Sequence, residues 1–282
     1  GINKPYQEKN VNIWVKGGAD KRKETSREEL QRLFQASGLI HADTMRANGL
    51  MISDLDMPYF RRFYQSRYGE SLDRQTIPLA QTIANMNLGQ NDMLNLAGAL
   101  LFAQNPSFRL PMYIVRGVAF PGNEITTEEY LDNRDLTGKM SDIFQQTVSF
   151  ILSHLNRVQG EQSVNSVGEL EIPRIVIEEL VANALVHRDY YVAAPVRVII
   201  FSDRIEIISP GHLPNQLTVE NIKTGNSVAR NPVIASFAPY VLPYRGLGSG
   251  ILRSIQSWPH IDFIDDRSGN QFRCVIWRRG PV

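Results

Sequence analysis

Cysteine is nearly absent from this sequence, which has Cys274 as its one cysteine in 282 residues. An internal disulfide bond is therefore excluded, and the composition fits a reducing compartment. Long apolar runs are also absent, because stretches such as residues 96–103 fall well short of the roughly 18 residues that span a bilayer. No leader with a charged start and an apolar core opens the chain. Together these absences predict a cytoplasmic protein that does not interact with membranes.

The sequence also lacks an excess of either charge, since its Lys and Arg number 30 and its Asp and Glu number 29, for a formal net charge of +1. Overall charge therefore argues neither for nor against a nucleic-acid partner. The phosphate loop G-x-x-x-x-G-K-[ST] of motor ATPases occurs nowhere in the chain. This absence excludes a motor helicase.

The chain is long enough for two domains at roughly 150 residues per domain. It begins without methionine and enters a strand-like segment almost at once, so we expect that it starts inside or just after another domain. A polar stretch over residues 159–173 separates its two halves.

The second half alternates helical and strand-like periodicity. The pattern predicts a helix, two strands joined by a tight turn, a long loop, two further helices and a closing hairpin. The predicted fold class is therefore α+β, with an antiparallel-rich sheet and helices on one face. The predicted segments are, in order, residues 173–187, 195–202, 204–209, 210–229, 230–242, 251–258, 260–266 and 271–279.

The helix predicted over residues 173–187 is apolar except for Glu179, Asn183 and His187, each four residues after the last. Spacing of four places all three side chains on one stripe of a helix. A polar group turned into the interior costs about 1–3 kcal/mol unless a partner satisfies it. The stripe therefore predicts either buried polar partners or a bound ligand.

A second feature lies far along the chain, where Gly246, Gly248 and Gly250 alternate just before a helix. Glycines let the backbone approach a ligand closely, and a helix N-terminus offers unpaired N–H groups and partial positive charge. Gly211, in the long loop, could allow a similar approach. These glycines predict a phosphate site.

A carboxylate, an amide oxygen and a phosphate site form a coherent chemical set. An amide oxygen such as that of Asn183 suits Mg²⁺, which keeps several waters and takes other ligands from phosphates. A carboxylate one turn away, that of Glu179, could accept a proton from a water that attacks the terminal phosphate.

Four ordered blocks carry a family resemblance over roughly residues 173–256. They read LVANALVHRDYY, VRVIIFSDRIEIISPGHLP, LTVENIKTGNSVARNP and RGLGSGILRSI. The set resembles the nucleotide site of the GHKL ATPases. More narrowly, it is similar to the GHKL-like domain of bacterial proteins labelled transcriptional regulators or RecG-related helicases. In those proteins the domain usually follows a Schlafen/Alba-like DNA-binding domain.

The resemblance implies a GHKL-like (Bergerat-type) α/β sandwich over residues 141–282, preceded by a connecting α+β module over residues 36–140. Residues 1–35 are similar to the tail of a Schlafen/Alba-like domain. The implied ligands are ATP and Mg²⁺, the implied role is that of a DNA-associated transcriptional regulator, and a homodimer is a further expectation. DNA would be bound through domains partly outside this chain.

By the same resemblance, Asn183 would hold the metal and Glu179 would orient or deprotonate the water. Residues 210–245 would form a mobile lid. The remaining residues expected around the nucleotide are His187, Gly211, Arg230, Arg245, Gly246, Gly248, Ser249 and Gly250.

Several alternatives stay open. Residues 208–211 lack the aspartate with which the superfamily binds the adenine amino group. A scaffold that has kept the fold and lost the ligand, acting in DNA binding or oligomerisation, is therefore the second reading, and a site for another phosphorylated ligand is the third. Glu179 and Asn183 could instead form a buried pair capped by Arg188 or by the loop near Ser209. The glycine-rich turn could be a hinge, and Arg230 and Arg245 could pair with acids.

Overall fold

The computed structural model describes residues 13–17, 20–24, 30, 33–35, 38–125, 128–158, 168–214, 217–244, 246 and 248–278. Residues 1–42 and residues 43–282 form two compact units. In the first unit, β1 (Ile13–Gly17) pairs antiparallel with β2 (Asp20–Glu24).

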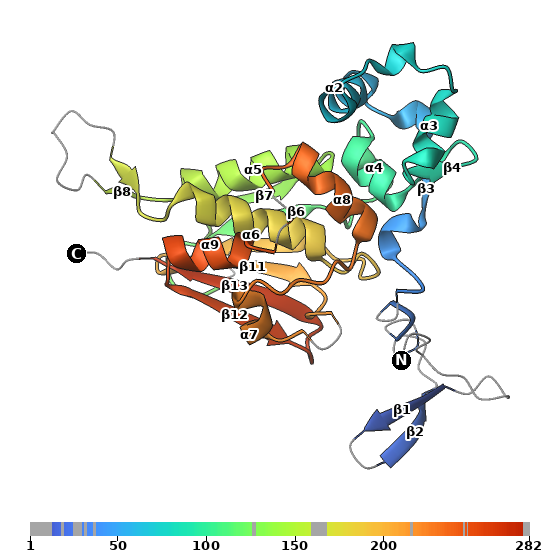
Figure 1. Cartoon of the computed structure of the whole chain (residues 1–282). Helices are drawn as coiled ribbons and strands as arrows, with labels where there is room; N and C mark the ends of the chain where they lie inside the picture. The colour runs from blue at the N-terminus through green and yellow to red at the C-terminus, as the bar shows by residue number, and fades with distance from the viewer. Residues whose placement is uncertain are drawn as a thin grey trace. The chain divides into compact units, whose positions relative to one another are not determined.

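The N-terminal part of the second unit combines a small three-stranded sheet with short helices (Figure 1). Asn95 begins α4, because its side chain accepts a hydrogen bond from the Gly98 amide at 2.8 Å. Phe60 and Phe102 pack together in the core of this part, and Phe237 from a helix later in the chain packs against Phe102. The elements are β3 (Arg46–Met51), α2 (Met57–Tyr68), α3 (Leu79–Asn85), β4 (Gly89–Gln90), β5 (Met93–Asn95) and α4 (Leu96–Phe102).

The main sheet has six strands in the order β12-β13-β11-β10-β6-β7. Neighbouring strands are antiparallel except β6 and β10, which are parallel. In β10 Arg197 is exposed, whereas Val198, Ile199 and Ile200 are all buried, so the end of the strand is covered on both faces. The strands are β6 (Val115–Ala119), β7 (Asp132–Leu136), β10 (Val196–Ile200), β11 (Arg204–Pro210), β12 (Ile261–Asp266) and β13 (Gln271–Trp277).

Helices α5, α6 and α9 lie on one face of this sheet (Figure 1). Helix α6 is buried on most of its sides because it packs against α5, α9 and β11. The helices are α5 (Met140–Ser153), α6 (Arg174–His187), α7 (Val219–Lys223), α8 (Pro232–Val241) and α9 (Gly250–Ser257), and a short hairpin is formed by β8 (Arg157–Val158) and β9 (Glu169–Leu170).

A buried lysine joins the N-terminal part to the sandwich. Lys139, which directly precedes α5, contacts Asp56 at the start of α2 and Asp142 on α5, each at 3.0 Å. The main sheet also takes in β6 and β7, which precede residue 141. The boundaries that we predicted between domains stay predictions.

The α+β fold class with helices on one sheet face is confirmed. The predicted helices over residues 173–187 and 251–258 are observed as α6 and α9. The long loop predicted over residues 210–229 also contains the short helix α7. Within the part of the chain that the structure describes, no helix combines the length and apolar character needed to cross a membrane.

Candidate functional site

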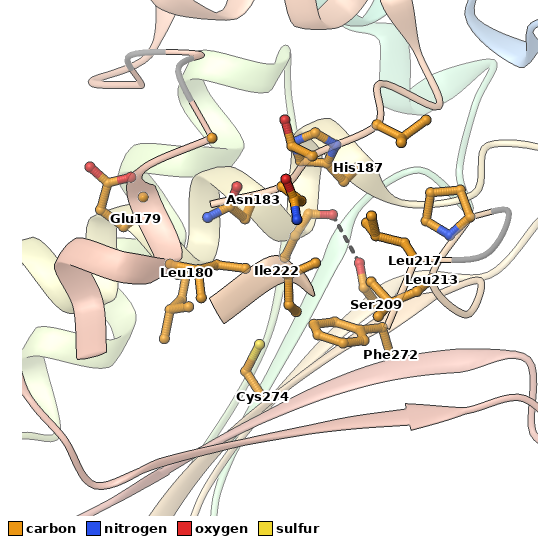
Figure 2. Close-up of a pocket in the computed structure, with 18 of the residues that line it drawn as sticks. Glu179, Leu180, Asn183, His187, Ser209, Leu213, Leu217, Ile222, Phe272 and Cys274 are labelled. Carbon is orange, nitrogen blue, oxygen red and sulfur yellow. Dashed lines mark hydrogen bonds between the residues drawn. The ribbon is translucent and has the colours of Figure 1, made fainter. Parts of the chain in front are cut away.

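A pocket lies between α6 and the strands β11 and β13, and it encloses about 950 Å³ including its solvent-open part. Residues 211–214 and 217–230, which we call the covering segment, and the first turn of α9 form its other walls. Figure 2 shows α6 above the pocket, with Phe272 and Cys274 on the sheet below. Eleven of its described lining residues have apolar side chains: Leu180, Ala184, Ile207, Leu213, Pro214, Leu217, Ile222, Val228, Ile251, Phe272 and Cys274.

The structure brings the polar stripe of α6 to this pocket. Glu179, Asn183 and His187 all line it, following one another along the helix (Figure 2). Glu179 is almost completely buried, with 1% of its surface exposed. The Asn183 Nδ2 group is buried and donates no hydrogen bond within the described structure.

The glycines that the sequence singled out line the same pocket. Gly211, Gly246, Gly248 and Gly250 are all lining residues. Gly248 has φ +70°, and a side chain there would also collide with the backbone oxygen of Gly225. Gly250 lies directly against the Glu179 carboxylate and 3.3 Å from Asn183 Nδ2, measured from the place of an added Cβ. The glycine-rich turn therefore lies against the polar stripe.

Three other predicted residues lie outside the described lining. Ser249 is the residue that precedes α9. Arg230 is buried; its Nη2 donates to the His212 carbonyl at 2.6 Å, and its Nη1 is 3.9 Å from Asp189. Arg245 is outside the residues that the structure describes.

An arginine that sequence reasoning missed meets the stripe. Arg253 lines the pocket from α9, and its Nη2 is 2.5 Å from Glu179 Oε1. Its Nε is buried and has no acceptor among the described residues. Its place one turn after Gly250 was the available signal, because i and i+3 share a helix face. Arg253 balances the charge of Glu179.

His187 is held by a second residue that the sequence did not single out, Tyr244. The His187 Nε2 and the Tyr244 hydroxyl are 3.0 Å apart. Burial, with a smaller contribution from Arg230, lowers the pKa of His187 from 6.5 to about 4. His187 is therefore neutral at physiological pH. It is a hydrogen-bonding group of the pocket wall and carries no positive charge.

The apolar end of the pocket has little free polar chemistry. The Ser209 hydroxyl donates to the Ala184 carbonyl at 2.9 Å, which links β11 to α6 (Figure 2). Burial raises the pKa of the Cys274 thiol to about 12, so this thiol stays protonated. Among the described lining residues Glu179 is the one acid, and it lies at the other end with the glycines. This end suits a flat apolar group.

The residues after the stripe have structural partners. Arg188 donates to the carbonyls of Val192 and Ala194 from a fully buried position. Asn231 Nδ2 donates to the carbonyls of Val186 and Arg188, each at 2.9 Å. These bonds fix the end of α6 and so the positions of Asn183 and His187. The Arg188 guanidinium thus meets these backbone carbonyls, and the arginine that pairs with Glu179 is Arg253.

The chemistry of the pocket bears on whether it could hold a metal ion. The described residues contain no group of three or more His, Cys, Asp or Glu side chains that could hold a metal. Asn183 beside Glu179 fits Mg²⁺ shared with phosphate oxygens and water, since Mg²⁺ takes few ligands from protein in such sites.

The comparisons with known proteins agree with this geometry. Residues 193–267 match the family model described as "Putative ATP-dependent DNA helicase recG C-terminal". The match covers β10, β11, the covering segment and α9, and begins after α6. It supports an ATPase-type domain, and the mixed sheet with helices on one face is consistent with a GHKL-like α/β sandwich.

One solved structure extends the comparison to nearly the whole chain. The DIP2311 protein from Corynebacterium diphtheriae is similar with a TM-score of 0.64 and 19% identity, over 99% of this chain and 55% of that one. At this identity the likeness shows the fold alone, and this chain spans about half the length of that protein. Comparison with curated proteins found no match.

Proposed function

We propose that the GHKL-like domain binds ATP with Mg²⁺ and that the protein is a DNA-associated transcriptional regulator. One observation carries the proposal: a single pocket gathers the α6 stripe, Gly211 and the alternating glycines. These segments are far apart in the sequence, and a nucleotide needs all of them.

The pocket has two chemically different ends that fit the two ends of a nucleotide. The glycine turn, with Asn183 beside it, offers backbone approach and a polar contact for phosphates and their Mg²⁺. Leu213, Phe272 and Cys274 line an apolar end that fits a base.

Slow hydrolysis would follow from Glu179. As an acceptor of the proton of an attacking water, it would act beside the phosphates while Mg²⁺ supplies charge neutralisation. No motor activity is proposed, because the chain has no phosphate loop of the motor type.

Titration calorimetry with ATP and Mg²⁺ tests the proposal. Wild type should bind with measurable heat at millimolar nucleotide. Asn183→Ala should abolish that heat because it removes the polar contact beside the glycines. The matched control Asn133→Ala changes an exposed asparagine of β7 and should bind like wild type. Absence of heat with wild type would contradict the proposal.

A second function, that of a scaffold without nucleotide, is favoured by two observations. Arg253 already pairs with Glu179, and Ser209 is bonded to Ala184 where the superfamily has an acid for adenine. A thermal-shift panel of nucleotides and phosphorylated metabolites distinguishes the readings. A shift with ATP supports the first, silence throughout supports the scaffold, and a shift only with another ligand supports a different phosphorylated substrate.

The partners follow from the same proposal. DNA would be bound through domains partly outside this chain, with an affinity that falls steeply with salt, and weakly by this chain alone. A homodimer and a cytoplasmic location complete the proposal. Light scattering after size-exclusion chromatography measures whether the protein is a homodimer.

A further inference from the structure

The ion pair between Arg253 and Glu179 lies where the proposed phosphates would bind. Arg253 is on α9, one turn after Gly250, and Glu179 is on α6 opposite it. The Glu179 side chain is 1% exposed, whereas that of Arg253 is 25% exposed. Arg253, which has the longer and more exposed side chain, is therefore the partner that can change its contacts.

The charged side chains that line the pocket make this ion pair important for the binding of an anionic ligand. Arg253 is the one lysine or arginine among the described lining residues, and Glu179 is the one acid. His187 adds no charge at physiological pH, because its pKa is about 4. A phosphate group beside the glycine turn would be repelled by the buried carboxylate unless Arg253 offsets the combined negative charge.

The hydrogen-bonding capacity near the turn is also incomplete. Arg253 Nε and Asn183 Nδ2 are both buried, and neither has an acceptor among the described residues. Buried donors of this kind are normally satisfied. Phosphate oxygens are strong acceptors, and a guanidinium binds them by charge-assisted bonds. Two donors and a glycine turn thus face the same small region.

We propose that Arg253 recognises the terminal phosphate of a bound nucleoside triphosphate by exchanging Glu179 for that phosphate. The inference rests on the proposed nucleotide function and adds the residue that distinguishes triphosphate from diphosphate. The exchange also frees Glu179 from its partner only when a third phosphate is present. Arg253 is therefore a specificity-determining residue. Glu179 becomes available for hydrolysis only when the bound ligand is a nucleoside triphosphate.

Calorimetric affinities for ATP and ADP, each with Mg²⁺, test the proposal on the whole chain. Wild type should prefer ATP. Arg253→Gln should weaken ATP binding by about tenfold or more because a charge-assisted contact is lost. ADP binding should change by less than about threefold, since ADP lacks the phosphate that Arg253 contacts. Arg197→Gln changes an exposed arginine of β10 and should leave both affinities unchanged.

A second variant addresses the buried charge that Arg253→Gln leaves behind. In the double variant Glu179→Gln/Arg253→Gln the pair is neutral, so the fold should hold, and ATP preference should still be lost. Glu179→Gln alone should tighten ATP binding by about threefold or more, because the competing carboxylate is gone. A residue that only supports the fold would not increase affinity when its partner is changed.

The outcomes separate this inference from the proposed function. Equal affinity of wild type for ATP and ADP, or equal weakening of both by Arg253→Gln, would overturn the role of Arg253 while nucleotide binding stands. Wild type that binds neither nucleotide would overturn both proposals.

Discussion

Within the α6 stripe, the structure clearly disfavours the protonated form of His187. It is partly buried in the pocket wall and hydrogen-bonded to Tyr244, and burial together with the nearby Arg230 lowers its pKa to about 4. In an unfolded chain its pKa would be near 6.5. Below that value the unfolded chain binds a proton that the folded chain does not. The contribution of His187 to stability is therefore fully present above about pH 6.5 and falls as the pH drops towards 4.

Replacing His187 with glutamine should remove this dependence on pH. The wild-type free energy of unfolding should decrease between pH 6.5 and 4 by up to about 2–3 kcal/mol from this group. His187→Gln cannot titrate and should show a flatter profile over the same window. Urea unfolding followed by circular dichroism at several pH values measures the difference. Parallel profiles for the two proteins would refute this account of His187.

Spacing along one helix predicted which residues of the stripe share a face. Glu179, Asn183 and His187 are neighbours because helix geometry is local and regular. Their partners could not be predicted in the same way, because Arg253 and Tyr244 lie on segments far along the chain. Which cation meets a buried carboxylate depends on how α9 packs against α6. The roles proposed for the three residues remain predictions.

At the scale of elements, the first turn of α9 packs unusually closely on α6. An added Cβ at Gly250 would collide with Glu179 Oε2, which belongs to a carboxylate that is itself buried and held by Arg253. The glycine therefore permits a close approach of two helices as well as of backbone to ligand. This approach is what brings the glycine turn and the stripe into one pocket.

Gly250→Ala should therefore reduce both stability and nucleotide binding. The methyl group must push α9 away from α6, and overpacking of this kind costs about 1–3 kcal/mol. Thermal unfolding and calorimetry with ATP and Mg²⁺ measure the two effects. Gly122→Ala is the control, since an added Cβ there meets nothing within 4 Å. Equal behaviour of the two variants would show that the close approach is unimportant.

Elements with strong periodicity were predictable, and short polar ones were not. Apolar residues recur through α6, and β10 and β11 are rich in β-branched residues. The sequence therefore predicts α6 as a helix and β10 and β11 as strands. Strand β7 reads Asp-Asn-Arg-Asp-Leu, and β4 has two residues. Such strands lie at sheet edges and owe their form to pairing with β6 and β5. Tertiary pairing decided these elements.

At the scale of the whole molecule, residues 43–282 form a compact unit distinct from residues 1–42. Asp43, at its start, is fully buried and accepts a hydrogen bond from the Ile234 amide at 3.0 Å, in the first turn of α8. The unit therefore includes its own first residues in its core. This organisation predicts where the chain can be shortened.

Removal of residues 1–42 should leave a protein that unfolds cooperatively near the wild-type temperature and binds ATP as the whole chain does. Removal of residues 1–51 is the matched control, because it also deletes β3 and Asp43, and it should lower the melting temperature strongly. Calorimetric melting of the three proteins measures this. A loss of cooperative unfolding in the shorter deletion would contradict the division into two units.

The covering segment is closed at its own base. Arg230 at its end donates to the His212 carbonyl near its start, and Gly211 fits between Arg230 and Asp189 with no room for a side chain. Because Arg230 and His212 hold its two ends together, we expect that exposed residues between them can change with little effect on α6 or β11. Proteins that descend from this chain could therefore acquire specificity for other small molecules through changes in the covering segment, while the sheet and helices around it stay the same.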